Sequence, residues 1–148
     1  MLSFFRMPKT AGGYVTSLMK RQGLPNKEVK IVRHIEIKPI HVKSMQVNQK
    51  FFTFARHPLS RLLSAYFWIK NVDDGKNHPK QNRIIHSCKD FEEVCLRLDE
   101  LNQVFSPHFF PMTKWINVSQ LDWFGKYENL VESVQEMNAR YNWNLQAV

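Results

Sequence analysis

The segment Pro8–Gly13 (Pro-Lys-Thr-Ala-Gly-Gly) places a lysine and two glycines between an apolar run and a stretch with helical spacing. Glycine lets the backbone approach an anion closely, the first N–H groups of a helix point toward it, and a lysine adds positive charge. The segment is not a Walker A loop, because Lys9 precedes the glycines instead of following them. It is therefore either a phosphate-binding loop or an ordinary strand-to-helix turn with a solvated lysine.

A second candidate anion site lies between Phe51 and Tyr66. Arg56 follows an apolar run that predicts a buried strand, at the end where open α/β sheets bind their ligands. Ser64 lies two turns into the helix predicted after Pro58, away from the apolar positions of that helix. An arginine and a hydroxyl can grip a phosphate together. Taken singly, each residue is better explained without a ligand, the arginine by pairing with a carboxylate and the serine by facing solvent.

These candidates need strands and helices to position them. Apolar runs predict strands over residues 2–7, 29–35 and 51–55, and a short fourth strand over 121–127. Because helical patterns separate these strands, the sequence predicts an α/β fold with a parallel sheet covered by helices on both faces.

Helices are predicted wherever apolar side chains recur at helical spacing. The predicted ranges are 14–21, 58–66, 91–101 and 130–141. In the second of these helices the predicted apolar stripe consists of Leu59, Leu62, Leu63 and Tyr66. The polar, turn-rich residues 71–89 predict a surface loop.

Composition limits the class of protein. A chain of 148 residues with 43% hydrophobic residues is long and apolar enough for one compact domain, expected over 1–148. The 21 Lys and Arg residues exceed the 13 Asp and Glu residues, giving a net charge of +8. This excess favours an anionic partner: nucleic acid, a phosphorylated or sulfated small molecule, an acidic polysaccharide or a membrane surface.

Two cysteines, Cys88 and Cys95, are too few for a disulfide scaffold or a four-cysteine metal site. No apolar run is long enough to span a membrane, and the apolar start of the chain is too short for a signal peptide. The expected location is therefore the cytoplasm.

Taken together, the motifs resemble the PAPS-dependent sulfotransferases, which use 3′-phosphoadenosine 5′-phosphosulfate, and particularly the carbohydrate O-sulfotransferase branch (heparan, chondroitin and uronyl types). Residues 8–14 resemble the family's loop for the 5′-phosphosulfate, and residues 56–66 resemble its segment for the 3′-phosphate. Residues 125–130 and 108–112 resemble two later family segments. Gly13 and Tyr14 stand where the family usually has Thr and Ser, so those hydroxyl contacts are lost or shifted to Thr16 and Ser17. His57 replaces an acidic residue.

The resemblance implies a three-layer, P-loop-like nucleotide-sulfotransferase fold that works without a metal. It implies PAPS as donor, adenosine 3′,5′-bisphosphate as product and a hydroxyl-bearing acceptor, with a glycan expected. The residues that the resemblance assigns to the 5′-phosphosulfate are Lys9, Thr10, Ala11, Gly12, Gly13 and Tyr14. Those that it assigns to the 3′-phosphate are Arg56 and Ser64.

Sulfuryl transfer, like phosphoryl transfer, needs a cation near the leaving phosphate oxygen and a base for the attacking hydroxyl. Lys9 is the expected cation. The carbohydrate branch has a histidine base near the end of its second strand, which favours His34 and leaves His41 as the alternative. His78 and His86 are expected to be exposed in the polar loop, which together with residues 108–115 is expected to shape the acceptor side.

Two other functions stay open on the sequence. A basic module that binds nucleic acid or another polyanion without catalysis is supported by the charge alone. An ATP-dependent phosphotransferase is disfavoured, because the Walker lysine position and an evident magnesium-binding aspartate pair are missing. A sulfotransferase, by contrast, predicts no nucleic-acid partner and no membrane span.

Overall fold

The alternation of strands and helices is present in a computed structural model, which describes residues 1–147. Contacts group these residues into two compact units, residues 1–57 with 112–147 and residues 58–111. The expectation of a single domain stays a prediction.

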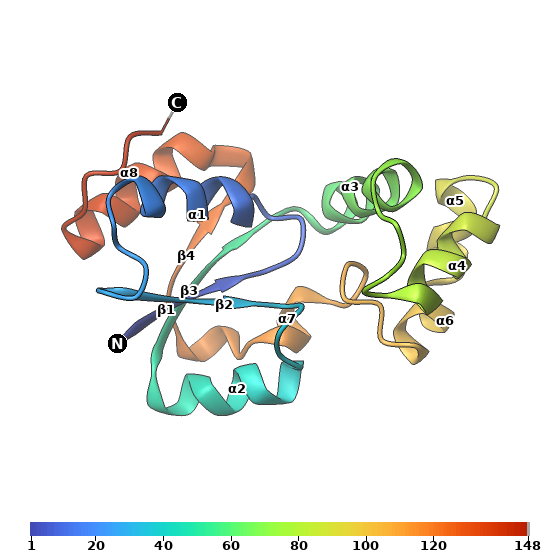
Figure 1. Cartoon of the computed structure of the whole chain (residues 1–148), viewed down its shortest axis with the longest axis horizontal. Coiled ribbons are helices and arrows are strands. Elements are labelled where there is room, and N and C mark those ends of the chain that lie inside the picture. Colours follow the sequence, from blue (N-terminus) through green and yellow to red (C-terminus); the bar gives the residue numbers. More distant parts are fainter. Residues whose placement is uncertain (148) are drawn as a thin grey trace. The chain divides into compact units, whose positions relative to one another are not determined.

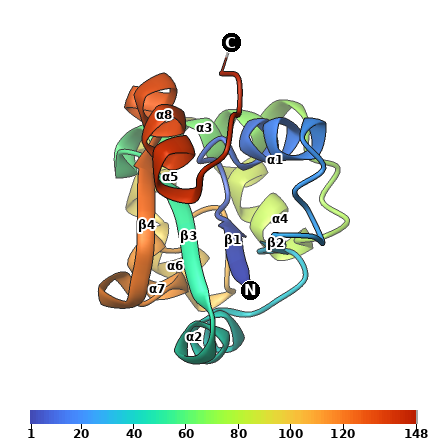
Figure 2. The same ribbon diagram turned by 90° about the vertical axis from the view of Figure 1, so that its left-hand side faces the viewer.

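The first unit contains a four-stranded sheet in which each neighbouring pair of strands is parallel. Its order is β2 (Val29–Arg33), β1 (Leu2–Arg6), β3 (Lys50–Ala55) and β4 (Leu121–Lys126), as Figure 2 shows. The four predicted strands are therefore confirmed. Since all strands run the same way, β1, β2 and β3 end at one edge of the sheet, where Arg6 lies opposite Arg33.

Helices cover both faces of this sheet (Figure 1). One face carries α1 (Gly12–Arg21) and α8 (Leu130–Tyr141), and the other carries α2 (Pro39–Asn48) and α7 (Met112–Trp115). Two short 3-10 helices, η1 (Val118–Gln120) and η2 (Tyr127–Asn129), flank β4. The expected α/β class is therefore confirmed, whereas α2 and α7 were not predicted.

Phenylalanines hold the helices on the sheet, because successive strand residues point to opposite faces. Phe4 stacks on Phe52 with ring centres 5.0 Å apart, within the core that α1 and α8 cover. Phe5 points to the opposite face, where its ring centre lies 5.5 Å from that of Trp115 in α7. Such burial on both sides explains why the central strands β1 and β3 are almost continuously apolar.

The second unit is helical among its described residues. It consists of α3 (Pro58–Asn71), α4 (Pro79–Ser87), α5 (Phe91–Leu96) and α6 (Leu98–Gln103). Its core includes Ala65 and Ile69 of α3, Ile85 of α4 and Leu101 of α6.

Three sequence predictions are wrong in this unit. The polar residues 71–89 contain α4, which buries Gln81, Ile84 and Ile85. The single helix predicted over 91–101 is two helices, because Arg97 leaves helical geometry at φ −107° and ψ 17°. The buried face of α3 consists of Arg61, Ala65 and Ile69, four residues apart, so Leu59 and Leu63 of the predicted stripe are exposed.

Candidate functional site

The predicted anion-binding loop connects β1 to α1 in the first unit. Lys9 and Ala11 adopt left-handed backbone conformations, with φ of 62° and 66°. The buried Thr10 hydroxyl donates a hydrogen bond of 3.0 Å to the carbonyl of Met7, which fixes the turn between them. Because the methyl group of the N-cap residue Ala11 cannot accept a hydrogen bond, that residue leaves the first N–H groups of α1 uncapped. This is the local geometry of a helix N-terminus suited to an anion.

Both glycines of the loop lie against the side chain of Arg6. A Cβ atom on Gly12 would stand only 2.3 Å from Cγ of Arg6, so any larger residue at position 12 would displace the arginine stem. A Cβ atom on Gly13 would stand 3.4 Å from Arg6 Nη2. The last residue of β1 therefore crosses the first turn of α1, a contact that sequence reasoning missed.

Lys9 and Arg56, distant in sequence, meet at this loop. The Nη1 atom of Arg56 donates a hydrogen bond of 3.3 Å to the carbonyl oxygen of Lys9. Burial lowers the pKa of the half-buried Lys9 ammonium, and the positive charge of Arg56 lowers this pKa further. Two like charges held together in this way favour an anionic ligand between or beside them.

Arg56 is held by residues that follow β4. Its guanidinium lies over the ring of Tyr127, 4.0 Å from the ring centre, which is cation–π geometry. The next backbone N–H, that of His57, donates a 2.6 Å hydrogen bond to the Glu128 carboxylate. This hydrogen bond is the main cause that lowers the pKa of Glu128, and Arg56 and His57 add to it by charge. Glu128 thus supplies a carboxylate at His57, where the resembling family carries an acid.

His34, the predicted base, is the first residue after β2, because the strand ends at Arg33 instead of continuing to Ile35. Its partly buried ring lies edge-on to Trp115 of α7, with ring centres 6.4 Å apart. The adjacent Arg33 and Glu36 form an ion pair across the same turn, with 2.8 Å between Nε and Oε1. The alternative, His41, is an exposed residue of α2.

An apolar cavity of about 120 Å³ lies near the same edge of the sheet. Met7, which precedes the loop, and Ala55, which precedes Arg56, form part of its wall. Met112 and Thr113 of α7 line it as well. Part of the 108–115 segment that was expected to shape the acceptor side therefore borders the ends of β1 and β3.

The comparisons with known proteins decide the family. A model of the Sulfotransferase family matches residues 2–144, nearly the whole chain. The chain belongs to the sulfotransferase family. Membership indicates a transferase of sulfuryl groups with a hydroxyl-bearing acceptor, in a family that generally uses PAPS. No curated protein and no solved structure gives a significant match.

The second unit of this sulfotransferase carries the other predicted residues. Ser64 is a partly buried residue of α3, and its role beside Arg56 stays a prediction. Arg61, one turn earlier, is buried and donates to the carbonyls of Phe110 at 3.0 Å and Pro107 at 3.3 Å. Burial lowers the pKa of Arg61 to about 10. These hydrogen bonds fix the segment that precedes α7 onto α3.

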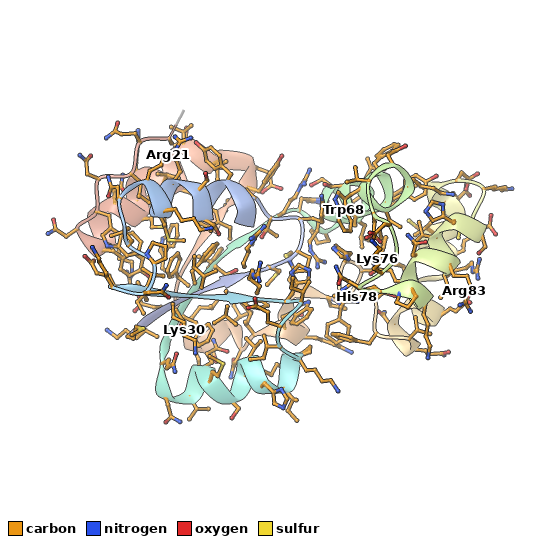
Figure 3. All side chains as sticks on the ribbon, viewed as in Figure 1. Arg21, Lys30, Trp68, Lys76, His78 and Arg83 are labelled. Atoms are coloured by element: carbon orange, nitrogen blue, oxygen red, sulfur yellow. The ribbon has the colours of Figure 1, made fainter. Side chains whose placement is uncertain are left out.

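His78 and His108 of this unit pack together. His108 is buried, with its ring 4.8 Å from that of Trp68 and 5.9 Å from that of His78. Its Nδ1 lies 3.0 Å from Nε2 of Gln81. Figure 3 labels Trp68 and His78 among the side chains of this region. His78 was expected to be exposed but is partly buried, and that burial lowers its pKa, whereas His86 is exposed as expected.

The described part of the chain has neither a metal-binding cluster nor a membrane-spanning helix. Within residues 1–147, no three His, Cys, Asp or Glu side chains gather in a way that could hold a metal ion. No helix in that range combines the length and the apolar character needed to cross a bilayer.

Proposed function

We propose that this sulfotransferase transfers the sulfuryl group of PAPS to a hydroxyl of a carbohydrate acceptor, without a metal, in a three-layer, P-loop-like fold. The observation that supports the proposal best is the contact between Arg56 and the carbonyl of Lys9. It joins the segments that resemble the 5′-phosphosulfate and 3′-phosphate sites of the family. Adenosine 3′,5′-bisphosphate is the expected product.

Each residue then has a defined role. The backbone N–H groups of residues 10–14 hold the 5′-phosphate, and the Lys9 ammonium neutralises the charge that develops on the leaving phosphate oxygen. Arg56 binds the 3′-phosphate through its planar fork, and the family resemblance assigns Ser64 to the same phosphate. Both anionic groups of one nucleotide are thereby matched by a cation.

His34 accepts the proton of the acceptor hydroxyl while that oxygen forms its bond to sulfur and the bond from sulfur to the phosphate oxygen breaks. In-line transfer requires the attacking and leaving oxygens to lie on opposite sides of the sulfur. The contact of His34 with Trp115 restricts its ring, which favours a fixed direction of proton transfer. His41, which is exposed on α2, is the alternative base.

Isothermal titration of the purified protein with adenosine 3′,5′-bisphosphate tests the donor site. Wild type and Lys20→Ala, which removes an exposed lysine of α1, should bind it equally, while Lys9→Ala and Arg56→Met should bind it at least tenfold more weakly. No binding by wild type would refute the proposal. Binding of DNA that falls steeply with salt and ignores the nucleotide would indicate a polyanion-binding module instead.

Transfer of labelled sulfate from PAPS to a panel of glycans and small alcohols tests the acceptor and the base. His34→Gln should abolish transfer without weakening nucleotide binding, and His41→Gln should leave both unchanged. Activity retained in His34→Gln and lost in His41→Gln would assign the base to His41.

A further inference from the structure

The Arg6 side chain lies against Gly12 and Gly13, and Gly13 is a position where the resembling family usually has threonine. Its stem crosses Gly12, whose Cβ position is 3.2 Å from both Cδ and Nε of Arg6. Its Nη2 atom lies 3.4 Å from the Cβ position of Gly13. A guanidinium therefore stands beside the position where the resembling family carries a threonine hydroxyl.

The serine and threonine one turn further along α1 do not supply the missing hydroxyl. The Thr16 hydroxyl is buried and donates a 2.6 Å hydrogen bond to the carbonyl of Gly12, inside the helix. Ser17, the next residue, is exposed. The first turn of α1 thus has glycine at residues 12 and 13, with the charged end of Arg6 next to it.

Charge around Arg6 also favours an anion. Burial lowers the pKa of its guanidinium, and Arg33, its neighbour across the β1–β2 register, lowers that pKa further. Glu36 acts in the opposite direction, but this carboxylate is exposed and forms an ion pair with Arg33. A partly buried cation beside a like charge and a helix N-terminus gains stability when an anion binds.

We propose that Arg6 binds the 5′-phosphosulfate end of the donor at the first turn of α1, in place of the hydroxyls that Gly13 and Tyr14 lack. This role rests on the proposed function, because it takes the nucleotide as ligand. Gly12 and Gly13 then serve Arg6 as well as the anion, since a side chain at residue 12 would displace the arginine stem.

Titration with two half-ligands separates this role from that of Arg56. Adenosine 5′-phosphate carries only the group assigned to Arg6, and adenosine 3′-phosphate carries only the group assigned to Arg56. Arg6→Met keeps most of the stem and removes the charge. This substitution should weaken the binding of adenosine 5′-phosphate and of adenosine 3′,5′-bisphosphate about 10- to 100-fold. The affinity for adenosine 3′-phosphate should fall less than twofold.

Arg21→Met is the matched control, because Arg21 lies at the opposite end of the same helix (Figure 3) and is exposed. It should bind all three nucleotides as wild type does. Arg6→Lys should recover part of the loss, since it restores the charge but not the fork of the guanidinium.

Restoring the family hydroxyl provides a second test. Gly13 does not have a positive φ, and a Cβ there meets only the end of the flexible Arg6 side chain, so Gly13→Thr should fold. In the Arg6→Met background, Gly13→Thr should recover at least threefold of the lost affinity for adenosine 5′-phosphate, while Gly13→Ala should recover none.

Several results would overturn the role of Arg6. If Arg6→Met loses affinity for both half-ligands equally, Arg6 is a structural residue. If nucleotide binding is unchanged and the KM for the acceptor rises, Arg6 belongs to the acceptor site. In both cases wild type still binds the bisphosphate, so the proposed function survives. If wild type binds none of the three nucleotides, the proposed function fails and the role of Arg6 fails with it.

Discussion

Replacing Tyr127 with leucine should lower the affinity of this sulfotransferase for a 3′-phosphate, although Tyr127 itself is not assigned to any ligand. The ring of Tyr127 lies 4.0 Å from the guanidinium carbon of Arg56, the residue proposed to bind that phosphate. Leucine keeps an apolar side chain at this position but removes the π face. Arg56 then keeps its hydrogen bond to Lys9 and loses the surface that restricts its remaining freedom.

The size of the effect follows from the exposure of the pair. Cation–π contacts contribute about 0.5–1 kcal/mol at exposed sites and about 2 kcal/mol when desolvated. Tyr127 is 37% exposed and Arg56 is partly buried, so a value near 1 kcal/mol is expected. This corresponds to roughly fivefold weaker binding of adenosine 3′-phosphate.

Isothermal titration of wild type, Tyr127→Leu and Tyr127→Phe with adenosine 3′-phosphate and adenosine 5′-phosphate measures this effect. Tyr127→Phe keeps the ring and should bind as wild type does. Phe124→Leu, which removes a 46% exposed aromatic ring from β4, is the matched control and should change neither affinity. The reasoning is refuted if Tyr127→Leu weakens both half-ligands equally, or if Tyr127→Phe is as weak as Tyr127→Leu.

Three further predictions concern stability. Gly125→Ala places a Cβ 2.5 Å from Cε1 of Phe54 and 2.7 Å from the ring of Trp123, so it should cost about 1–3 kcal/mol and lower Tm by roughly 2–10 °C; Gly13→Ala, whose nearest contact is 3.4 Å, should leave Tm unchanged, and equal Tm values would contradict the packing argument. Hydrogen bonds from Arg140 and Tyr141 lower the pKa of Asp122, so their stabilisation is complete above the unfolded pKa and is lost as pH falls through the folded one. Urea unfolding of Asp122→Asn should therefore show a loss of about 1–2 kcal/mol at pH 7 that shrinks toward pH 3, and a loss independent of pH would exclude this origin. Burial and Arg56 lower the pKa of Lys9, so the unfolded chain binds the proton more tightly and stability rises with pH between the folded and unfolded pKa values. Lys9→Met should remove that dependence, raise the Tm of the unliganded protein and reduce its stabilisation by adenosine 3′,5′-bisphosphate, as thermal melts from pH 7 to 10 would show.

The strands were predictable because their pattern is strong and local. Runs such as Phe51–Ala55 are apolar on both sides, as buried parallel strands require. The helices that were missed have weak patterns: α2 buries only Val42 and Gln46, and α4 contains a buried glutamine among polar residues. Tertiary packing outweighs local pattern at such positions, so a single sequence does not reveal them.

The site was predictable only where the motif itself carries the chemistry. Lys9 and Arg56 follow buried strands and therefore carry a signal for the ligand-binding edge of the sheet. Arg6 reaches the site only because α1 packs its first turn against the end of β1. Tyr127 reaches it only because the chain brings this residue to Arg56, about seventy residues earlier in the sequence. The end of an apolar run was the one available signal for Arg6, and it did not indicate which way the side chain points.

The charges of this edge explain why an anion with several negative groups suits it. Arg6 ends β1, Lys9 follows three residues later, and Arg56 follows β3, the direct neighbour of β1 in the sheet. The positive end of α1 lies beside them, and the pKa values of Arg6 and Lys9 are both lowered. Arg56 lowers the pKa of Lys9 and Arg33 lowers that of Arg6, so like charges are held close at both positions. At the proposed sites, a nucleotide with separate 3′- and 5′-anionic groups places one negative group at Arg56 and the other at Lys9 and Arg6, whereas a single phosphate neutralises only one of these positions.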